Sequence, residues 1–134
     1  MQKKALKWLI LFFLVTPTIC SFSQVKKNKL DAKSFYNKLI SIKDPLIIDT
    51  RPGYKFQENR IQNAVLAESQ DELLKLIKIV PKDTPIFVYC QIGDRSKRTV
   101  KVLKGNGFTK VYELEDGLVT WIEAGLPLDT IKFE

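Results

Sequence analysis

One segment near the middle of the chain constrains the fold more than any other. An apolar run at 85–89 ends at Cys90, a short polar loop follows at 91–96, and residues 97–104 have the spacing of a helix. A thiol between a strand and a helix faces the backbone N–H groups of the loop and of the first helical turn, and Arg95 adds a guanidinium. Each of these favours thiolate over thiol, so the sequence predicts a nucleophilic cysteine.

The rest of the chain alternates short strands with helices. Apolar runs predict strands, and apolar residues at helical spacing behind a capping residue predict helices. The strands are expected at 46–49, 64–67, 85–89 and 110–114, and the helices at 31–42, 69–80, 97–104 and 118–123, with a turn at Pro52-Gly53. This alternation is typical of an α/β fold with a mostly parallel central sheet and helices on both faces.

The loop after Cys90 has a recognisable pattern. The residues Cys90-Gln91-Ile92-Gly93-Asp94-Arg95-Ser96 read Cys-x-x-Gly-x-Arg-Ser. After a hydrophobic strand, this pattern resembles the active-site loop of the rhodanese family, whose cysteine carries a sulfane sulfur as a persulfide. Segments 47–51, 60–65 and 107–117, and then Trp121 with 124–127, resemble other parts of that family in the expected order. The resemblance covers 30–128 and implies a single rhodanese-like domain.

Four positions depart from the family pattern. Arg60 stands where a histidine is usual, and Asn63 and Asp116 stand where glycines are usual, which implies local differences in backbone shape. Asp94 places an acid inside the reactive loop. It would oppose thiolate formation or repel an anionic donor unless it points to solvent or pairs with Arg98 at the helical spacing of four.

The resemblance implies sulfur transfer in two steps, without a metal or organic cofactor. The Cys90 thiolate would take the outer sulfur of thiosulfate or of another persulfide, and a thiol or protein acceptor would then remove it. Arg95 would support the negative charge or hold the loop. Ser96 would cap the following helix and donate to the persulfide, and Gly93 would supply a positive φ.

Other side chains are expected to support the pocket. Gln91 and Ile92 would shape its rim together with Asp94. Asp49 and Arg51 follow another strand, and in parallel sheets ligands collect at the carboxyl ends of strands, so this segment could share the pocket with Cys90. Arg51 is as much expected to pair with Asp49 as to contact substrate.

Two other functions have to be weighed against sulfur transfer. Cysteine-dependent phosphatases and arsenate reductases use related loops, but those have five residues between cysteine and arginine and commonly a preceding histidine. Here four residues separate Cys90 from Arg95, Tyr89 precedes the cysteine, and the chain contains no histidine. A shorter ring of N–H donors suits one terminal sulfur better than three phosphoryl oxygens. A partner-binding module without turnover would not need the complete loop.

The N-terminus predicts export. Three lysines precede an apolar block at 8–15, and Ser21-Phe22-Ser23 follows, so 1–23 is expected to be a signal peptide and the protein periplasmic or secreted. A membrane anchor that stays uncleaved is the alternative, although the block is shorter than the roughly 20 residues of a spanning helix. Processing as a lipoprotein at Cys20 is disfavoured because Ile19 before it is bulky. Residues 24–29 would form a leader and 129–134 a C-terminal tail.

Removal of the signal peptide also changes charge and cysteine content. The net charge falls from +7 to +4 because three lysines are lost. The remaining basic residues are scattered among acids, so a nucleic-acid partner is not expected. Cys90 is then the single cysteine, which excludes an internal structural disulfide. A monomer with no stable membrane span is expected.

Overall fold

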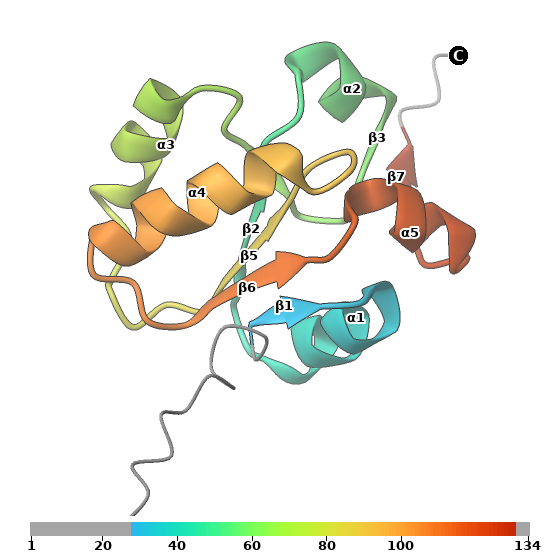
Figure 1. Cartoon of the computed structure of the whole chain (residues 1–134), viewed down its shortest axis with the longest axis horizontal. Coiled ribbons are helices and arrows are strands. Elements are labelled where there is room, and N and C mark those ends of the chain that lie inside the picture. Colours follow the sequence, from blue (N-terminus) through green and yellow to red (C-terminus); the bar gives the residue numbers. More distant parts are fainter. Residues whose placement is uncertain (1–27, 131–134) are drawn as a thin grey trace, which may run out of the picture.

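The computed structural model describes residues 28–130 of the 134-residue chain, so the predicted signal peptide lies outside the described residues. Five parallel strands form the central sheet in the order β1-β6-β5-β2-β4 (Figure 1). They are β1 (Lys29–Leu30), β2 (Leu46–Asp49), β4 (Val65–Leu66), β5 (Ile86–Tyr89) and β6 (Val111–Leu114). The predicted α/β fold with a parallel sheet is confirmed.

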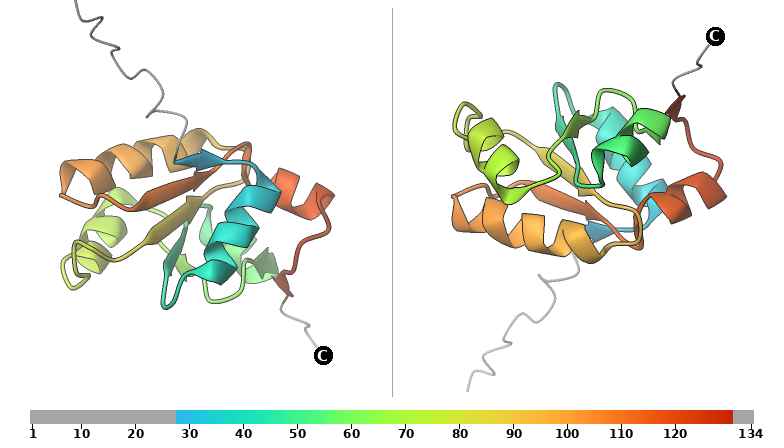
Figure 2. Two further views of the ribbon diagram at one scale, coloured as in Figure 1. Left: turned by 90° about the horizontal axis from the view of Figure 1, so that it is seen from below. Right: turned by 90° about the horizontal axis from the view of Figure 1, so that it is seen from above.

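Helices cover both faces of this sheet. They are α1 (Ala32–Ser41), α2 (Gly53–Glu58), α3 (Gln70–Ile77), α4 (Asp94–Gly105) and α5 (Gly117–Glu123). Helices α1 and α5 pack on one face and α3 and α4 on the other, as two views at right angles to the first show (Figure 2). None of the helices within 28–130 is long and apolar enough to cross a membrane.

The two apolar cores follow from the alternation of side chains along the strands. In β5, Phe87 and Tyr89 join the core under α1 and α5, whereas Ile86 and Val88 join the core under α3 and α4. All four are fully buried. A strand buried on both faces reads as a continuous apolar run, which is why the apolar residues at 85–89 predict this strand.

Side-chain caps begin two of the helices where the sequence predicts them. Asp31 accepts a hydrogen bond from the backbone N–H of Ser34, at 3.0 Å, and starts α1. Ser69 and Glu72 form a reciprocal capping box at the start of α3. Helix α3 ends at Ile77 rather than near residue 80, in keeping with the bias against helical backbone just before Pro81.

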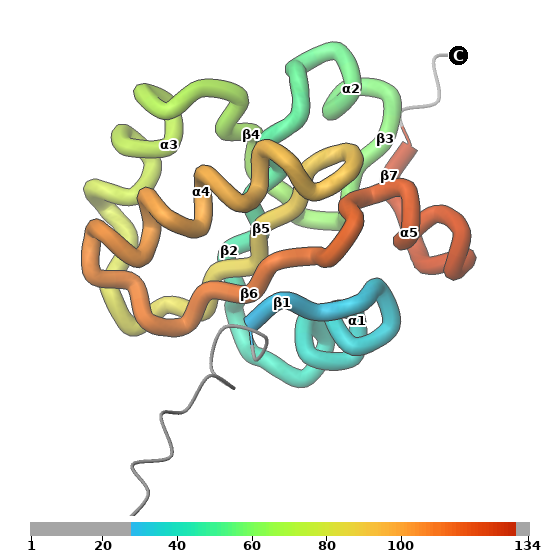
Figure 3. Tube along the Cα trace, in the orientation of Figure 1, coloured from blue at the N-terminus to red at the C-terminus, as the bar shows by residue number. Residues whose placement is uncertain are grey.

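Several elements differ from the sequence prediction. Helix α4 begins at Asp94, three residues earlier than expected, and the turn expected at Pro52-Gly53 is the start of α2. Strand β1 begins at Lys29, in the predicted leader. The strands β3 (Asn59–Arg60) and β7 (Asp129–Thr130) form a separate antiparallel pair that places the first residues of the predicted tail beside the domain (Figure 3). Each missed strand has two residues, too few to show a hydrophobic period.

Candidate active site

The carboxyl ends of β2 and β5 meet at one edge of the sheet. The two strands pair in parallel register, and the N–H of Thr50 donates to the carbonyl of Tyr89 at 3.0 Å. The residues that follow each strand therefore face the same space. An open hollow of about 370 Å³ lies there, lined by Arg51, Pro52, Cys90, Gln91, Ile92, Asp94 and Arg95. The segment after β2 and the reactive loop share one pocket, as the sequence predicts.

Cys90 lies at the inner end of this hollow and is only 2% exposed. Its Sγ accepts a hydrogen bond from the backbone N–H of Gly93 at 3.0 Å and lies 3.6 Å from Oγ of Ser96. Gly93 has φ +98°, the left-handed conformation expected for it, which turns its N–H back toward the sulfur. The sequence predicts that several loop amides face the thiol. In the described part of the chain, a single backbone N–H, that of Gly93, donates a hydrogen bond to Sγ of Cys90.

Ser96 is not the cap of α4. Because Gly93 already turns the chain as the N-cap, the helix starts at Asp94 and Ser96 is its third residue, fully buried. Its Oγ lies 3.1 Å from the carbonyl of Gly93 and 2.9 Å from Oε1 of Glu113 on β6. The sequence analysis does not identify Glu113 as a site residue. The one indication in the sequence is an acidic residue in a strand whose other side chains are apolar or aromatic.

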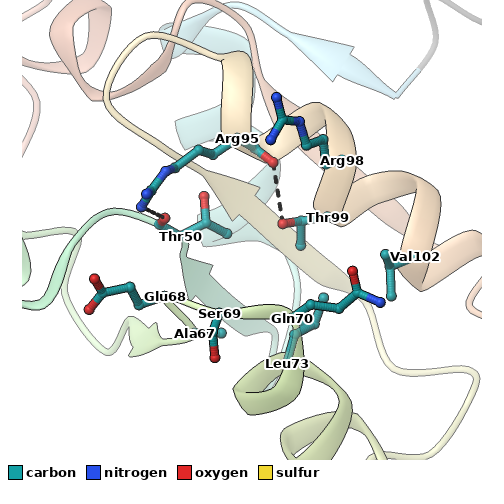
Figure 4. Close-up of a pocket in the computed structure, with 10 residues that line it drawn as sticks. All are labelled: Thr50, Ala67, Glu68, Ser69, Gln70, Leu73, Arg95, Arg98, Thr99 and Val102. Carbon is teal, nitrogen blue, oxygen red and sulfur yellow. Dashed lines mark hydrogen bonds between the residues drawn. The ribbon is translucent and has the colours of Figure 1, made fainter.

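Arg95 holds the start of α4 to the end of β2. Its Nη1 donates to the carbonyl of Thr50 at 3.2 Å while the side chain stays exposed. The guanidinium also borders a second hollow of about 240 Å³ (Figure 4). In that view Arg98 and Thr99 extend the α4 side of the hollow. Opposite them lie Glu68 and Ser69, just before α3, and Gln70, its first residue. Arg95 thus separates two neighbouring hollows.

Arg51 pairs with Asp49, which answers the question that the sequence left open. Its Nε lies 3.0 Å from both carboxylate oxygens and its Nη2 lies 2.7 Å from Oδ2. Both side chains are buried. The guanidinium also reaches Oδ1 of Asn59 at 3.1 Å and Oε1 of Gln91 at 3.4 Å. Arg51 therefore links the end of β2 to the reactive loop from below the hollow.

Tyr89 completes this buried polar layer. Burial, and after it the negative charge of Asp49, raises the pKa of Tyr89 well above its usual range. The neutral phenol oxygen accepts a hydrogen bond from the N–H of Ile61 at 3.1 Å. This bond ties β5, immediately before Cys90, to the segment that follows β3.

Asp94 lies at the rim of the hollow and is exposed to solvent. Exposure to solvent and pairing with Arg98 are the two arrangements that the sequence predicts would make its charge tolerable. Neither of the two ion pairs in the described part of the chain joins Asp94 to Arg98. As the first residue of α4, it is stabilised by the positive end of the helix. Ile92 is 60% exposed at the same rim, and Lys97, Arg98 and Lys101 are exposed along α4.

The first turn of α5 supports the loop from behind. The N–H groups of Leu118 and Val119 donate to the carbonyls of Cys90, at 2.8 Å, and of Gln91, at 3.3 Å. Gly117 allows this approach: a Cβ there would lie 2.4 Å from the carbonyl oxygen of Gln91, and its φ is +72°. Asp116 also has a positive φ, +58°, so the departure from glycine at this position keeps a left-handed backbone.

We expect Gly117→Ala to destabilise the protein and displace the loop. The positive φ would cost about 1 kcal/mol, and the contact with Gln91 would raise the loss to roughly 2–4 kcal/mol. Gly125→Ala is the matched control, because Gly125 has φ +66° but nothing within 4 Å of its Cβ position. Urea unfolding of both variants measures the difference. Equal losses would show that the loop does not rest on Gly117.

The described residues offer no metal site. No group of three His, Cys, Asp or Glu side chains within 28–130 is arranged to hold a metal ion. The chemistry that the site offers is that of a buried thiol with an N–H donor and a hydroxyl, beneath a hollow whose rim carries Asp94 and Arg95. Fold and site together define an α/β domain with a cysteine loop at the carboxyl end of a parallel strand.

Comparison with known proteins assigns the family. The family model described as Rhodanese-like domain matches residues 31–124. The chain belongs to the rhodanese-like domain family.

The relatives differ in how much of their own length this chain covers. A protein named sulfurtransferase, from Allochromatium vinosum, is 28% identical over 101 residues, which cover 75% of this chain and 94% of the relative. A tRNA uridine(34) hydroxylase from Pelagibacter ubique is 29% identical over 100 residues, covering 73% of this chain and 33% of the relative. The chain thus spans nearly all of the first relative and about a third of the second.

Solved structures share the fold. A rhodanese-related protein from Thermoplasma volcanium superposes with a TM-score of 0.66 at 25% identity, covering 76% of this chain and 97% of that one. A thiosulfate sulfurtransferase from Pseudomonas aeruginosa gives a TM-score of 0.68 at 22% identity, covering 83% of this chain and 22% of that one. At 22% identity the second likeness concerns the fold alone.

Proposed function

We propose that this protein is a sulfurtransferase that carries a sulfane sulfur as a persulfide on Cys90. The observation that carries the proposal is the thiol itself, buried beneath an open hollow and hydrogen-bonded by the backbone N–H of Gly93. A sulfurtransferase that this chain spans almost end to end supports the same reading. The donor in the proposal is thiosulfate or another persulfide, and the acceptor is a thiol or a protein.

The proposed cycle has two nucleophilic displacements. The Cys90 thiolate attacks the outer sulfur of thiosulfate, a new S–S bond forms, and the bond to the sulfonate sulfur breaks with its electron pair, so that sulfite leaves. An acceptor thiolate then attacks the outer sulfur of the persulfide and releases the Cys90 thiolate. The N–H of Gly93 is already placed to stabilise negative charge at the sulfur before attack.

Charges at the rim influence the approach of an anionic donor. Arg95 is exposed beside the hollow and one of its N–H groups is bound to Thr50, so the guanidinium is held at the mouth. In the proposal it attracts the donor, and Asp94 on the same rim opposes this attraction. Export to a periplasm or to the exterior is part of the proposal and rests on the sequence of residues 1–23.

The proposal predicts a specific change of mass. After exposure to thiosulfate and removal of excess reagent, intact mass spectrometry should show a gain of one sulfur atom, and cyanide should reverse it by accepting that sulfur. Cyanide-stable oxidation products, which add oxygen rather than sulfur, serve as the internal control. Absence of the adduct with thiosulfate and with a low-molecular-weight persulfide would reject sulfur transfer in favour of a partner-binding module.

A further inference from the structure

A buried carboxylate stands behind the reactive cysteine. Glu113, on β6, is 7% exposed. Its neighbours in the strand, Tyr112 and Leu114, pack toward α1 and α5, so its side chain faces α4 on the other side of the sheet. Oε1 of Glu113 lies 2.9 Å from Oγ of Ser96. The ion pairs among residues 28–130 are Arg51–Asp49 and Lys55–Glu58, so Glu113 is buried without a cationic partner within 4.0 Å.

Ser96 stands between this carboxylate and the thiol. Its hydroxyl has one hydrogen to donate and two lone pairs to accept with. Three groups surround it: the thiol of Cys90, whose Sγ donates to Oγ across 3.6 Å, and two acceptors for its own hydrogen, the carbonyl of Gly93 at 3.1 Å and Oε1 of Glu113 at 2.9 Å. The protonation state of Glu113 therefore decides where the hydrogen points. An ionised Glu113 takes it and leaves a lone pair of Oγ for the S–H of Cys90. A protonated Glu113 donates to Ser96, and that hydrogen is then free for the sulfur or for the carbonyl of Gly93.

We propose that Glu113 is a positioning residue that holds the proton of Cys90, relayed through Ser96, while the thiolate is free to react. The S–H bond breaks as its hydrogen moves to Oγ of Ser96, the hydrogen of Ser96 moves to Oε1 of Glu113, and the electron pair stays on the sulfur. The net charge of the three groups is −1 before and after. The inference deepens the proposed function, although this proton transfer itself does not depend on any sulfur donor.

One cationic side chain on the elements packed against β6 is half-buried on the same face of the sheet as Glu113. Lys29 of β1 is in register with Glu113 but forms no ion pair with it, and Val88 of β5, on the other side, is apolar. Lys38 of α1 lies over the ring of Tyr112, on the opposite face of the sheet. The charged side chains of α4 are all exposed: Asp94, Arg95, Lys97, Arg98, Lys101 and Lys104.

Two groups that share one proton titrate as a pair. Between the two titration steps of the pair, the fraction present as thiolate does not change with pH, so the rate of thiol alkylation should show a flat shoulder at intermediate pH. Glu113→Gln keeps the shape of the side chain and an acceptor for Ser96 but cannot take a proton. Its rate should rise in a single step without a shoulder.

The test is the rate of alkylation of Cys90 by iodoacetamide from about pH 5 to about pH 10, a range that brackets the ordinary pKa of a thiol. It uses the full chain carrying Cys20→Ser, so that Cys90 is the single thiol, and follows the adduct by intact mass. At the acid end of the shoulder, Glu113→Gln should react about tenfold more slowly than the parent. Glu115→Gln, the same change at an exposed position two residues away, should keep the shoulder.

Any other alkylation profile overturns the relay. Faster alkylation of Glu113→Gln at every pH would mean that the carboxylate only repels the thiolate, and an unchanged profile would mean that its bond to Ser96 is structural. If Glu113→Gln fails to fold, Ser96→Ala removes the bridge instead and must also lose the shoulder. A parent protein that shows the shoulder but takes no sulfur from thiosulfate would refute the proposed function and leave the relay standing.

Discussion

Replacing Cys90 with serine should abolish sulfur transfer, with a loss of at least about a thousandfold in the rate of thiocyanate formation from thiosulfate and cyanide. A serine hydroxyl at this position can still accept the N–H of Gly93, so the loop is expected to keep its shape. It is not ionised at neutral pH, however, and cannot form the S–S bond on which both displacements depend. The mass gain of one sulfur should disappear together with turnover.

Cys20→Ser provides the matched control for this experiment. It makes the same chemical change at the other cysteine of the chain and should leave both sulfur loading and thiocyanate formation at the parent level. Circular dichroism and the midpoint of thermal unfolding establish that Cys90→Ser is folded. Turnover that survives in folded Cys90→Ser would mean that another group carries the sulfur.

Arg51→Met should destabilise the protein more than any other single change considered. It removes the guanidinium that holds the fully buried carboxylate of Asp49, and leaving one charge of a buried pair without its partner typically costs about 3–5 kcal/mol. That is a large part of the roughly 5–15 kcal/mol by which domains are stable. Loss of the contact with Gln91 should also loosen the reactive loop.

Urea unfolding measures this prediction, with Lys55→Met as the matched control. Lys55 pairs with Glu58 at 3.3 Å on the surface, and the loss of an exposed pair should cost less than about 1 kcal/mol. Adding Asp49→Leu to Arg51→Met should recover part of the lost stability, because it removes the unpaired charge. Equal losses for Arg51→Met and Lys55→Met would show that Asp49 finds another partner or is reached by water.

The elements that the sequence predicted well are those with a local physical signal. Strand β5 is a continuous apolar run because both of its faces are buried, and α1 and α3 start at capping residues whose hydrogen bonds are local. The left-handed φ at Gly93 was expected because the loop is too short to turn without it. The family pattern then placed all of these elements in one fold.

The elements that the sequence did not predict depend on contacts between distant residues. Strand β1 exists because Lys29 and Leu30 pair with β6, more than eighty residues later in the chain, and β3 exists because it pairs with β7. Two residues carry no measurable period. The start of α4 was placed too late because the polar residues of its first turn have no apolar spacing, although the backbone of Gly93 already directs them into the helix.

The residues of the candidate site also fall into those that the sequence identifies and those that contacts between distant residues bring in. The residue types of the loop, from Cys90 to Ser96, are local, so the sequence by itself determined the thiol, the glycine that turns the loop, and the arginine and serine that follow. Which groups meet the thiol was decided by tertiary structure. Parallel pairing of β2 with β5 brings Arg51 beneath the hollow, and pairing of β5 with β6 brings Glu113 to Ser96. A sequence shows which side chains are present, whereas hydrogen bonds require the distances that the register of the sheet imposes.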